Sequence, residues 1–409
     1  MPLHSLRVRD EALTVIARVF GVVAGIVSSA ITARTLGPED RGSYFFVITV
    51  ATILTQFGHL GVSSANTFFV ARYPRCAGLL LQWSIRLSLV SGIGLALIFM
   101  VLSESSALAD TMNSKGLPWL ILLSPAMLLL LLASALLAGL QAFSSLNGIQ
   151  IAYQMILVCA FGLVALYKPS IDSFLGASAL GACVAAIAYS GAVYFHRSNQ
   201  APARADEVET SNWFKYGMRA YLILLAGALV PRIGIFFVKA EASAEELGYY
   251  SIAIQIFDAL VLFPSAIATI LFPSIAKDKA PTWLGCLREC YRMGFFASVL
   301  AIIAAVALPF AVKLVFGSEY AQSAVIAQAL LPGFVALSVV TIASQYLAAK
   351  YFPRPTYWNW FVSLAVLLAA CAILVPNYGA LGVAIALSVS YSILAILMVN
   401  LARQLLEPS

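Results

Sequence analysis

The sequence predicts an all-α membrane protein of about twelve transmembrane helices, in two six-helix bundles related by a pseudo-two-fold axis along the membrane normal. Three observations predict this fold class: the composition, a series of long apolar stretches, and a similarity between the two halves. Of the 409 residues, 62% are hydrophobic and 10% are charged, and the mean hydropathy is +0.93. Soluble domains carry about 25% charged residues, so the solvent of most of this chain is a lipid bilayer.

A membrane-spanning helix needs about 20 mostly apolar residues to cross a hydrocarbon core about 30 Å thick. Helices are expected because they satisfy their backbone hydrogen bonds within one segment. The first stretch follows a basic start, as in a signal peptide, but the many spans behind it favour a retained helix. Twelve stretches qualify, within 13–34, 43–66, 79–102, 118–140, 149–167, 173–195, 214–238, 248–272, 293–316, 322–348, 357–375 and 380–401.

The polar segment "HRSNQAPARADEVETSNW" (196–213) divides the chain into predicted bundles at 1–195 and 214–409 and is itself predicted to be a cytoplasmic linker. At an offset of 206 residues, "RGSYFFVITVATILTQF" aligns with "LGYYSIAIQIFDALVLF", which superposes Gly42 on Gly248. Because each half has six predicted spans, both halves enter the membrane from the same side and have the same orientation. This arrangement predicts an axis along the membrane normal, as in parallel-repeat transporters.

Two short segments predict turns that separate neighbouring spans. "GPED" (37–40) combines a helix-breaking glycine and proline with two acids suited to the start of the next helix. "VPNYGALG" (375–382) predicts a second tight turn on the same side of the membrane. Most loop lysines and arginines lie on the other side, which the positive-inside rule makes cytoplasmic. Both termini are therefore predicted to be cytoplasmic.

The net charge of +6 does not indicate a nucleic-acid partner, because the basic residues lie in short loops between apolar stretches. The six cysteines include no CxxC pair and have no histidine companions. Cys286 and Cys290 are four residues apart, but two thiols alone do not make a zinc site. The sequence therefore predicts no metal and no cofactor.

Two spans that match under the offset carry polar residues at helical spacing, which places each set on one helix face. Such faces are expected to point away from lipid, either toward a water-accessible lumen or into hydrogen bonds between helices. Gln56 and Gln255 are the predicted substrate contacts among them. The two sets are Thr49, Thr52, Gln56, His59, Ser63 and Asn66, and Ser251, Gln255, Asp258, Ser265 and Thr269.

Four arginines lie well inside the ends of predicted spans and are predicted to bind substrate. Arg18, Arg86 and Arg219 lie roughly 8–10 Å inside the cytoplasmic helix ends, whereas Arg232 is nearer the outer end of its span. The alternative is that they extend to the lipid headgroups. Arginines that face the interior indicate an anionic ligand, and phosphate fits the guanidinium fork especially well.

Asp258 is the single carboxylate within the predicted spans, about half a span into its helix. A carboxyl group there could bind a proton in one conformational state and release it in another, which makes it a candidate for ion coupling. The alternative is a fixed ion pair or hydrogen bond that holds two helices together. His59 is a second coupling candidate, with a hydrogen-bonded packing role as its alternative.

"ARTLGPEDRGSYFFV" (33–47) and "FGHLGVSSANTFFVAR" (57–72) resemble the opening of the Wzx-type polysaccharide-unit flippases. These flippases belong to the multidrug/oligosaccharidyl-lipid/polysaccharide (MOP) exporter superfamily. The resemblance covers nearly the whole chain. It continues in "ELGYYSIAIQIFDALVLFPSAIATILFPSIAK" (246–277), "FGSEYAQSAVIAQALLPGFVALS" (316–338) and "VPNYGALGVAIALSVSY" (375–391).

The resemblance implies a flippase that moves undecaprenyl-pyrophosphate-linked repeat units of lipopolysaccharide or exopolysaccharide to the outer leaflet. It implies alternating access with proton or ion coupling, no catalytic residues, and a multi-pass protein of the bacterial cytoplasmic (inner) membrane. The implied partners are the lipid-linked oligosaccharide, the bilayer, and further a polysaccharide polymerase and glycosyltransferases. Arg18 and Arg219 match the family's cavity arginines loosely, and Arg86 and Arg232 less closely.

Two other functions remain open on the sequence. A multidrug or cation antiporter of the same superfamily would share the fold, but it would be expected to have an acidic cavity. A membrane-embedded polysaccharide polymerase or ligase would need catalytic groups in a sizeable outer loop. The longest predicted outer loop, "SESSALADTMNSKGL" (103–117), contains no histidine or arginine.

Overall fold

The structure, a computed structural model, describes residues 2–104, 116–196, 210–277, 282–349, 353 and 355–407. Within these ranges the chain forms helices joined by turns, and no strand occurs, so the predicted all-α class is confirmed. Three short 3-10 helices occur at Pro74–Cys76 (η1), Leu117–Trp119 (η2) and Ser318–Tyr320 (η4).

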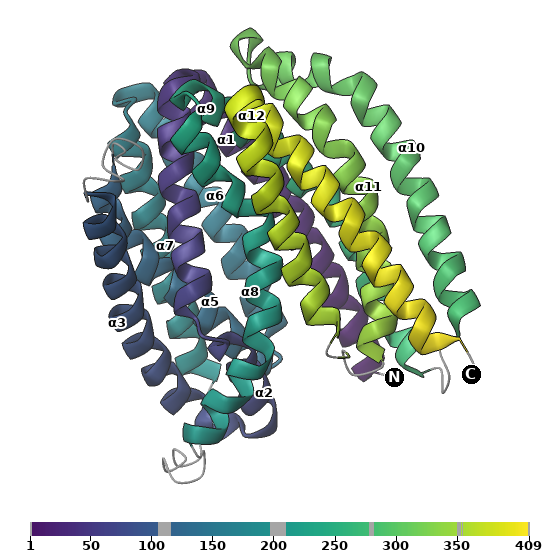
Figure 1. Cartoon of the computed structure of the whole chain (residues 1–409). Coiled ribbons are helices and arrows are strands. Elements are labelled where there is room, and N and C mark those ends of the chain that lie inside the picture. Colours follow the sequence, from purple (N-terminus) through teal and green to yellow (C-terminus); the bar gives the residue numbers. More distant parts are fainter. Residues whose placement is uncertain are drawn as a thin grey trace. The chain divides into compact units, whose positions relative to one another are not determined.

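Figure 1 shows the α-helices of the chain. They follow the apolar stretches of the sequence and mostly extend a few residues beyond them. Because a helix end can be solvated outside the hydrocarbon core, it is free to run past its apolar part. The helices are α1 (Pro2–Gly58), α2 (Val62–Arg72), α3 (Ala77–Ser103), α5 (Leu120–Gly139), α6 (Phe143–Tyr167), α7 (Ile171–His196), α8 (Thr210–Glu241), α9 (Ala244–Lys277), α10 (Trp283–Val315), α11 (Ala321–Ala349) and α12 (Pro355–Leu406).

The two longest helices, α1 and α12, each consist of two arms. A straight helix of 57 residues would be about 85 Å long, almost three times the thickness of a bilayer core. Non-helical backbone interrupts α1 at Gly37 (φ 70°, ψ 174°) and α12 at Gly379 (φ 52°, ψ −132°). Each of these two helices turns back on itself at the upper end of the view in Figure 1. The turns predicted at 37–40 and 375–382 are therefore confirmed.

By length and composition, nine helices of the described residues can cross a membrane, with α1 and α12 each counted once. The chain is thus a multi-pass membrane protein. The count of twelve spans stays a prediction.

The predicted second span, 43–66, is wrong as a single helix. α1 ends at Gly58, and a turn follows in which Leu60 (φ 45°) and Gly61 (φ 76°) adopt the left-handed region before α2 begins at Val62. A helix cannot continue through two such residues. Ser63 and Asn66 therefore lie on α2, and the predicted polar set is not one continuous helix face.

The described chain forms two compact units. The chain passes from the first unit to the second within α8, between Leu225 and Ala226. The first comprises Met1–Leu36 and Ser43–Leu225, and the second comprises Gly37–Gly42 and Ala226–Ser409. Most of the predicted linker, 196–213, lies outside the described residues. The predicted domain boundaries therefore stay a prediction.

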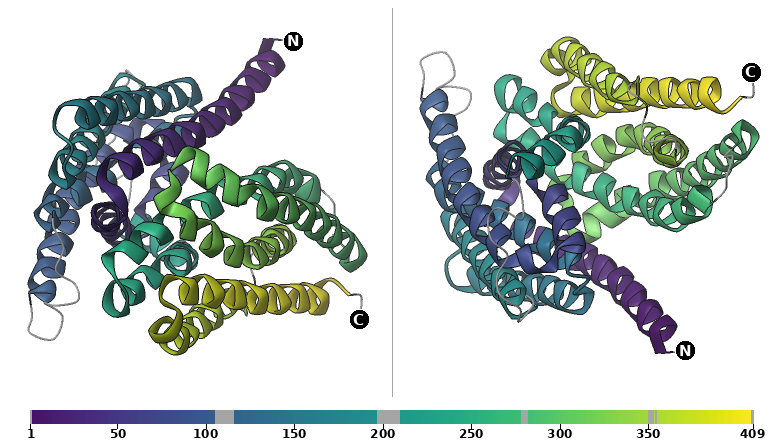
Figure 2. Two further views of the ribbon diagram at one scale, coloured as in Figure 1. Left: turned by 90° about the horizontal axis from the view of Figure 1, so that it is seen from above. Right: turned by 90° about the horizontal axis from the view of Figure 1, so that it is seen from below.

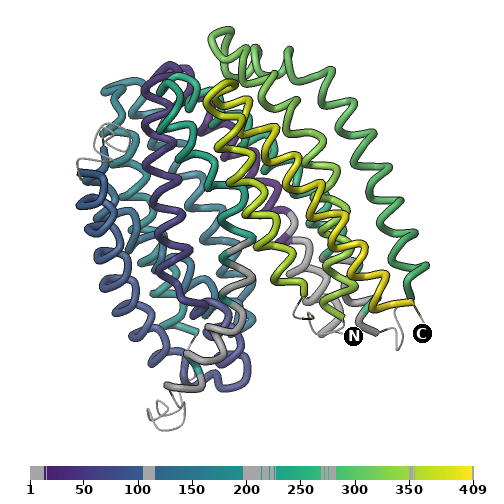
Figure 3. Tube along the Cα trace, in the orientation of Figure 1, coloured from purple at the N-terminus to yellow at the C-terminus, as the bar shows by residue number. Residues whose placement is uncertain are grey.

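In the first unit, α5 is the central helix. It packs against α2, α3 and α7, and these helices lie side by side in the chain trace (Figure 3). Leu128, Leu132 and Leu136 of α5 are fully buried in a cluster with Leu80 of α3. Spacing of four residues places the three leucines along one side of the helix.

In the second unit, α11 occupies the central position. It packs against α9, α10 and α12, as the views from above and below show (Figure 2). Phe334 and Leu347 of α11 are completely buried. At Gly333 the backbone approaches α12 closely, and its N–H donates to Ser388 Oγ at 3.1 Å.

The short segment Gly37–Gly42 packs against the start of α9 within the second unit. A Cβ atom on Gly248 would lie 2.0 Å from the carbonyl oxygen of Pro38, and one on Gly42 would lie 2.1 Å from that of Ala244. Arg41, which is buried, donates from Nε to Ser251 Oγ at 3.3 Å. Glycine at both positions is what permits this backbone contact.

Candidate functional site

The structure brings together two of the predicted site residues, Arg232 of α8 and Asp258 of α9. Arg232 Nη2 donates to Asp258 Oδ2 at 3.4 Å. The side chains are 30% and 44% exposed, respectively, so the pair is accessible at the surface of the second unit. The ion pair that the sequence analysis named as an alternative for Asp258 is therefore present, and a coupling role stays a prediction.

Two buried tyrosines lie within electrostatic reach of this pair. Tyr250 of α9 and Tyr391 of α12 both interact with Asp258 and Arg232. The Tyr250 hydroxyl is buried and has no hydrogen-bond partner among the described residues. The ring of Tyr391 stacks on Phe257, with centroids 6.0 Å apart. The pair is thus partly exposed and lies within electrostatic reach of two buried phenol groups.

Gln255, another predicted contact, lies one turn before Asp258 on α9 and is half-buried. Residues three apart on a helix are neighbours on its surface. The amide of Gln255 is therefore on the same face of α9 as the carboxylate, as its spacing in the sequence indicates.

Gln56 and His59 form a second polar group, in the first unit. His59 Nδ1 accepts from the Gly61 N–H at 2.9 Å, and Nε2 lies 3.2 Å from Gln56 Oε1. Because Nδ1 accepts, the ring hydrogen belongs on Nε2, which donates to Gln56. The imidazole is 2% exposed and meets the Tyr221 ring edge-on at 5.4 Å.

These contacts give His59 a role in ending α1. Its ring satisfies a backbone N–H in the turn that carries Leu60 and Gly61, and Tyr221 donates to the Phe57 carbonyl at 3.0 Å on the preceding turn. Ion coupling through His59 stays a prediction. The hydrogen bond from His59 Nε2 to Gln56 Oε1 orients the Gln56 side chain, so that its amide NH₂ faces away from the imidazole.

The remaining arginines are not brought to one point by described contacts. Arg18 of α1 and Arg86 of α3 are both exposed in the first unit. Arg219 lies on α8, and its side chain is outside what the structure describes. Exposure of Arg18 and Arg86 is compatible with both interpretations made from the sequence, ligand binding and extension to the headgroups.

A polar face on α6 was not predicted from the sequence. Asn147 Nδ2 donates to Thr14 Oγ1 of α1 at 2.9 Å, and Gln150 lies 3.8 Å from the Cβ position of Gly21. Thr14 and Gly21 are on either side of Arg18 along one face of α1. The spacing of Asn147, Gln150 and Gln154 in an otherwise apolar stretch was the signal that could have identified this face.

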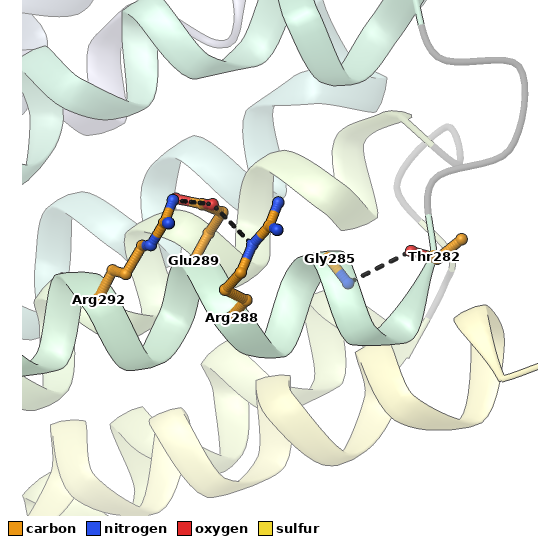
Figure 4. Close-up of polar contacts among 5 residues, drawn as sticks. All are labelled: Thr282, Gly285, Arg288, Glu289 and Arg292. Carbon is orange, nitrogen blue, oxygen red and sulfur yellow. Dashed lines mark hydrogen bonds and ion pairs between the residues drawn. The ribbon is translucent and has the colours of Figure 1, made fainter.

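At the start of α10, an exposed charged group follows the helix cap (Figure 4). Thr282 Oγ1 accepts from the Gly285 N–H at 3.2 Å, and Glu289 lies between Arg288 and Arg292 at 3.4 Å and 3.0 Å. Exposed ion pairs of this kind contribute about 0–1 kcal/mol. This group is best explained as a solvated helix end.

Other features of the described residues do not coincide with the predicted site. A cavity of about 620 Å³ between α6 and α7 is lined mainly by small and aliphatic side chains, with Lys168 and Asp172 at one end. It contains none of the predicted site residues. Among the described side chains, no group of three or more histidines, cysteines or acids is placed to hold a metal ion.

Comparison with known families and proteins identifies relatives over most of the chain. The model of a family described as polysaccharide biosynthesis protein matches residues 8–278. The probable flippase AglR of Haloferax volcanii is 28% identical over 222 residues, which is 51% of this chain and 45% of AglR. The aligned region thus spans less than half the length of that relative.

Solved structures show the same fold at low sequence identity. The lipid II flippase MurJ, in an inward closed conformation, has a TM-score of 0.75 at 14% identity, over 96% of this chain and 87% of MurJ. An inward-facing multidrug resistance MATE family transporter of the MOP superfamily has a TM-score of 0.74 at 14% identity, over 94% of each chain. The predicted superfamily fold is confirmed, and it is shared by flippases and drug transporters.

Proposed function

Because the chain belongs to the polysaccharide biosynthesis protein family, we propose that it is a flippase for lipid-linked oligosaccharides of polysaccharide biosynthesis. The cargo in this proposal is an undecaprenyl-pyrophosphate-linked repeat unit of lipopolysaccharide or exopolysaccharide. It moves from the inner to the outer leaflet of the bacterial cytoplasmic membrane, with both termini of the chain on the cytoplasmic side. A polysaccharide polymerase and glycosyltransferases act beside it as the proposed partners.

The balance of charge within the predicted spans carries the proposal. Four arginines and a single carboxylate lie well inside the span ends, and Arg18 and Arg86 are exposed on their helices. A charged residue costs about 2.5–3.5 kcal/mol at the centre of a span, and guanidinium groups bind phosphate through paired hydrogen bonds. This charge balance favours an anionic cargo over the cations of a multidrug antiporter, which is the second candidate because the fold is shared.

In the proposed cycle the pyrophosphate is captured by Arg18, Arg86 and Arg219 near the cytoplasmic side while the lipid tail stays in the bilayer. Gln56 and Gln255 offer amide groups to the sugars. Arg232 receives the anion as the two units exchange access between the leaflets. Outward movement of negative charge is favoured in an inside-negative cell by about 2.3 kcal/mol per charge per 100 mV.

Proton coupling in this proposal involves Asp258, with His59 as a further candidate. The accessible position of Asp258 beside Arg232 supports a role for the carboxylate, because a partly exposed group can exchange protons with water. For His59, both ring nitrogens already have hydrogen-bond partners. Its contribution in this proposal is mainly to hold Gln56.

The test is flipping of a lipid-linked oligosaccharide in reconstituted vesicles. Arg18→Ala and Arg219→Ala are each expected to reduce the rate at least tenfold, whereas Arg292→Ala, an exposed arginine at the start of α10, serves as the matched control. A cationic dye in the same vesicles tests the antiporter alternative. Uptake of the dye without flipping of the lipid would replace the proposal with the antiporter.

A further inference from the structure

Arg232 in this structure is already neutralised by a carboxylate. Its Nη2 atom donates to Asp258 Oδ2 at 3.4 Å, and both side chains are partly exposed. A guanidinium group has five N–H donors in a planar fork, of which this contact uses one. An anion that reaches Arg232 from the accessible side therefore meets donors that are free to bind it, and a carboxylate with which it must compete.

We propose that Arg232 and Asp258 form a site of partner exchange, in which a phosphate group of the cargo takes the place of Asp258 on Arg232 and Asp258 then binds one proton. This inference rests on the proposed function in one respect, the pyrophosphate of the cargo. The exchange breaks the Arg232–Asp258 contact and forms hydrogen bonds from Arg232 to phosphate oxygens. The proton comes from water and is bound at a carboxylate oxygen of Asp258.

The first step is favoured by the difference between the two kinds of contact. A partly exposed ion pair contributes little because water screens it. Two parallel N–H···O bonds to a phosphate bind the same guanidinium more strongly and fix its orientation. The single bond of 3.4 Å to Asp258 is long for a charge-assisted contact, which is usually about 2.7–2.9 Å. The contact with Asp258 is therefore expected to be weaker than a bidentate contact with phosphate.

The second step follows from the charges that remain around Asp258. Once Arg232 holds a phosphate, an ionised Asp258 faces an anion at short range and has lost its cation. The other titratable groups within its reach are phenols, Tyr250 of its own helix and Tyr391 of α12. Neither can supply positive charge, so protonation of Asp258 is the change that removes the repulsion.

Arg232 is the cation that acts on Asp258 among the described residues. Arg41 also packs on α9, but it donates to Ser251, two turns before Asp258. α11 packs along α9, and its one titratable side chain, Tyr346, interacts instead with Cys286 and Glu289 at the start of α10. The Tyr250 hydroxyl is buried, without a partner among the described residues, and interacts electrostatically with Asp258. A neutral Asp258 avoids the unfavourable interaction of its negative charge with these surroundings.

The exchange has a defined thermodynamic consequence. Anion binding and proton binding at this site each require the ion pair to open, so each promotes the other. The empty site has no net charge, because the arginine and the aspartate cancel. The loaded site carries one more proton than the empty site, and this proton accompanies the cargo.

The experiment uses the purified full chain in lipid nanodiscs and dimethyl pyrophosphate as the probe. This diester keeps both negative charges between about pH 5.5 and 8, so any pH dependence of binding belongs to the protein. Calorimetry in two buffers of different ionisation enthalpy counts the protons taken up on binding. We expect uptake approaching one proton, and binding about tenfold tighter for each pH unit toward the acid end over which that proton is taken up, as proton linkage requires.

Three variants accompany the wild type. Asp258→Asn, which has nearly the same shape, is expected to bind the probe equally at both pH values without proton uptake. Asp258→Glu is expected to keep the pH dependence, which separates loss of the carboxyl group from misfolding. Glu289→Gln, which like Asp258→Asn removes one negative charge, is the charge-matched control at the start of α10 and is expected to behave as wild type.

Proton uptake by Asp258→Asn equal to that of the wild type would overturn the exchange, as would probe binding by the wild type without any uptake. Flipping assays separate this result from the proposed function. Normal flipping with no linked proton removes the exchange and leaves the flippase intact. Linked probe binding without flipping of lipid-linked oligosaccharide keeps the exchange site and removes the proposed cargo.

Discussion

Gly42 and Gly248, which occupy matching positions in the two halves of the sequence, lie in direct contact. A Cβ atom on Gly42 would be 2.9 Å from the backbone nitrogen of Gly248. The offset of 206 residues that aligns the halves therefore also pairs two residues that touch. Their contact holds the turn after Gly37 against the start of α9 within the second unit.

Gly248→Ala is expected to destabilise the protein by about 1–3 kcal/mol, because the new methyl group meets backbone atoms that have no room to move. Its Cβ would lie 2.0 Å from the Pro38 oxygen. Thermal unfolding in detergent measures the effect. Gly94→Ala is the matched control, since nothing lies within 4 Å of its Cβ position. Equal unfolding midpoints for the two variants would contradict the close contact.

Glu246→Ala is expected to cost about 1–2 kcal/mol, because it removes the acceptor that begins the second arm of α12. Glu246 Oε2 accepts from the Ala380 N–H at 2.7 Å, directly after Gly379. Hydrogen exchange at residues 380–384 should accelerate in this variant. Glu241→Ala, an exposed acid at the end of α8, should leave that exchange unchanged. Unaltered exchange in Glu246→Ala would show that the bond is not needed.

Trp213→Phe is expected to cost about 1–3 kcal/mol through one lost hydrogen bond. The Trp213 indole donates to Asn66 Oδ1 at 3.2 Å, and Asn66, which is completely buried, donates to Ser84 Oγ at 2.9 Å. Phenylalanine keeps a ring against Trp83 but leaves the amide oxygen of Asn66 unpaired. Chemical unfolding monitored by fluorescence checks the value. If Trp83→Phe, which keeps this bond, is equally destabilised, ring packing rather than the hydrogen bond explains the loss.

Cys159 is expected to be the most reactive cysteine toward a lipid-soluble maleimide, because it is exposed on the apolar helix α6. Cys76, Cys286 and Cys371 are buried and should react only after unfolding in strong detergent. Mass spectrometry of the labelled chain identifies the sites. A charged, membrane-impermeant maleimide should not modify Cys159 in vesicles if its face of α6 contacts lipid. Rapid labelling by that reagent would place Cys159 in water instead.

Arg18→Lys separates the two interpretations of the intramembrane arginines. Lysine keeps the charge and can also extend to the headgroups, but it lacks the planar fork that binds phosphate in two places. If Arg18 binds the cargo, flipping in vesicles should fall about tenfold or more. If Arg18 only reaches the headgroups, Arg18→Lys should flip at the wild-type rate. Arg34→Lys, in the same helix near the turn, is the control for the substitution itself.

Hydropathy along the chain determined the membrane environment, the helical class and the position of most spans. These follow from the sequence because the need to satisfy the backbone in lipid acts locally, on each stretch of about 20 residues. The turns at Gly37 and Gly379 were predictable for a similar reason, since glycine and proline act on their own backbone. The resemblance to the flippases depended on such local segments as well.

Only the tertiary structure decided which helices are neighbours. Lipid and helix surfaces are both apolar, so hydropathy cannot separate a face that meets lipid from one that meets another helix. The pairing of Arg232 with Asp258, the contact of Asn147 with Thr14, and the break that separates Asn66 from α1 all depend on packing between segments. The spacing of polar residues identified Gln255 and Asp258 as members of one face. Which helix that face touches depends on how all the helices of the bundle pack together, and one stretch of sequence does not determine this packing.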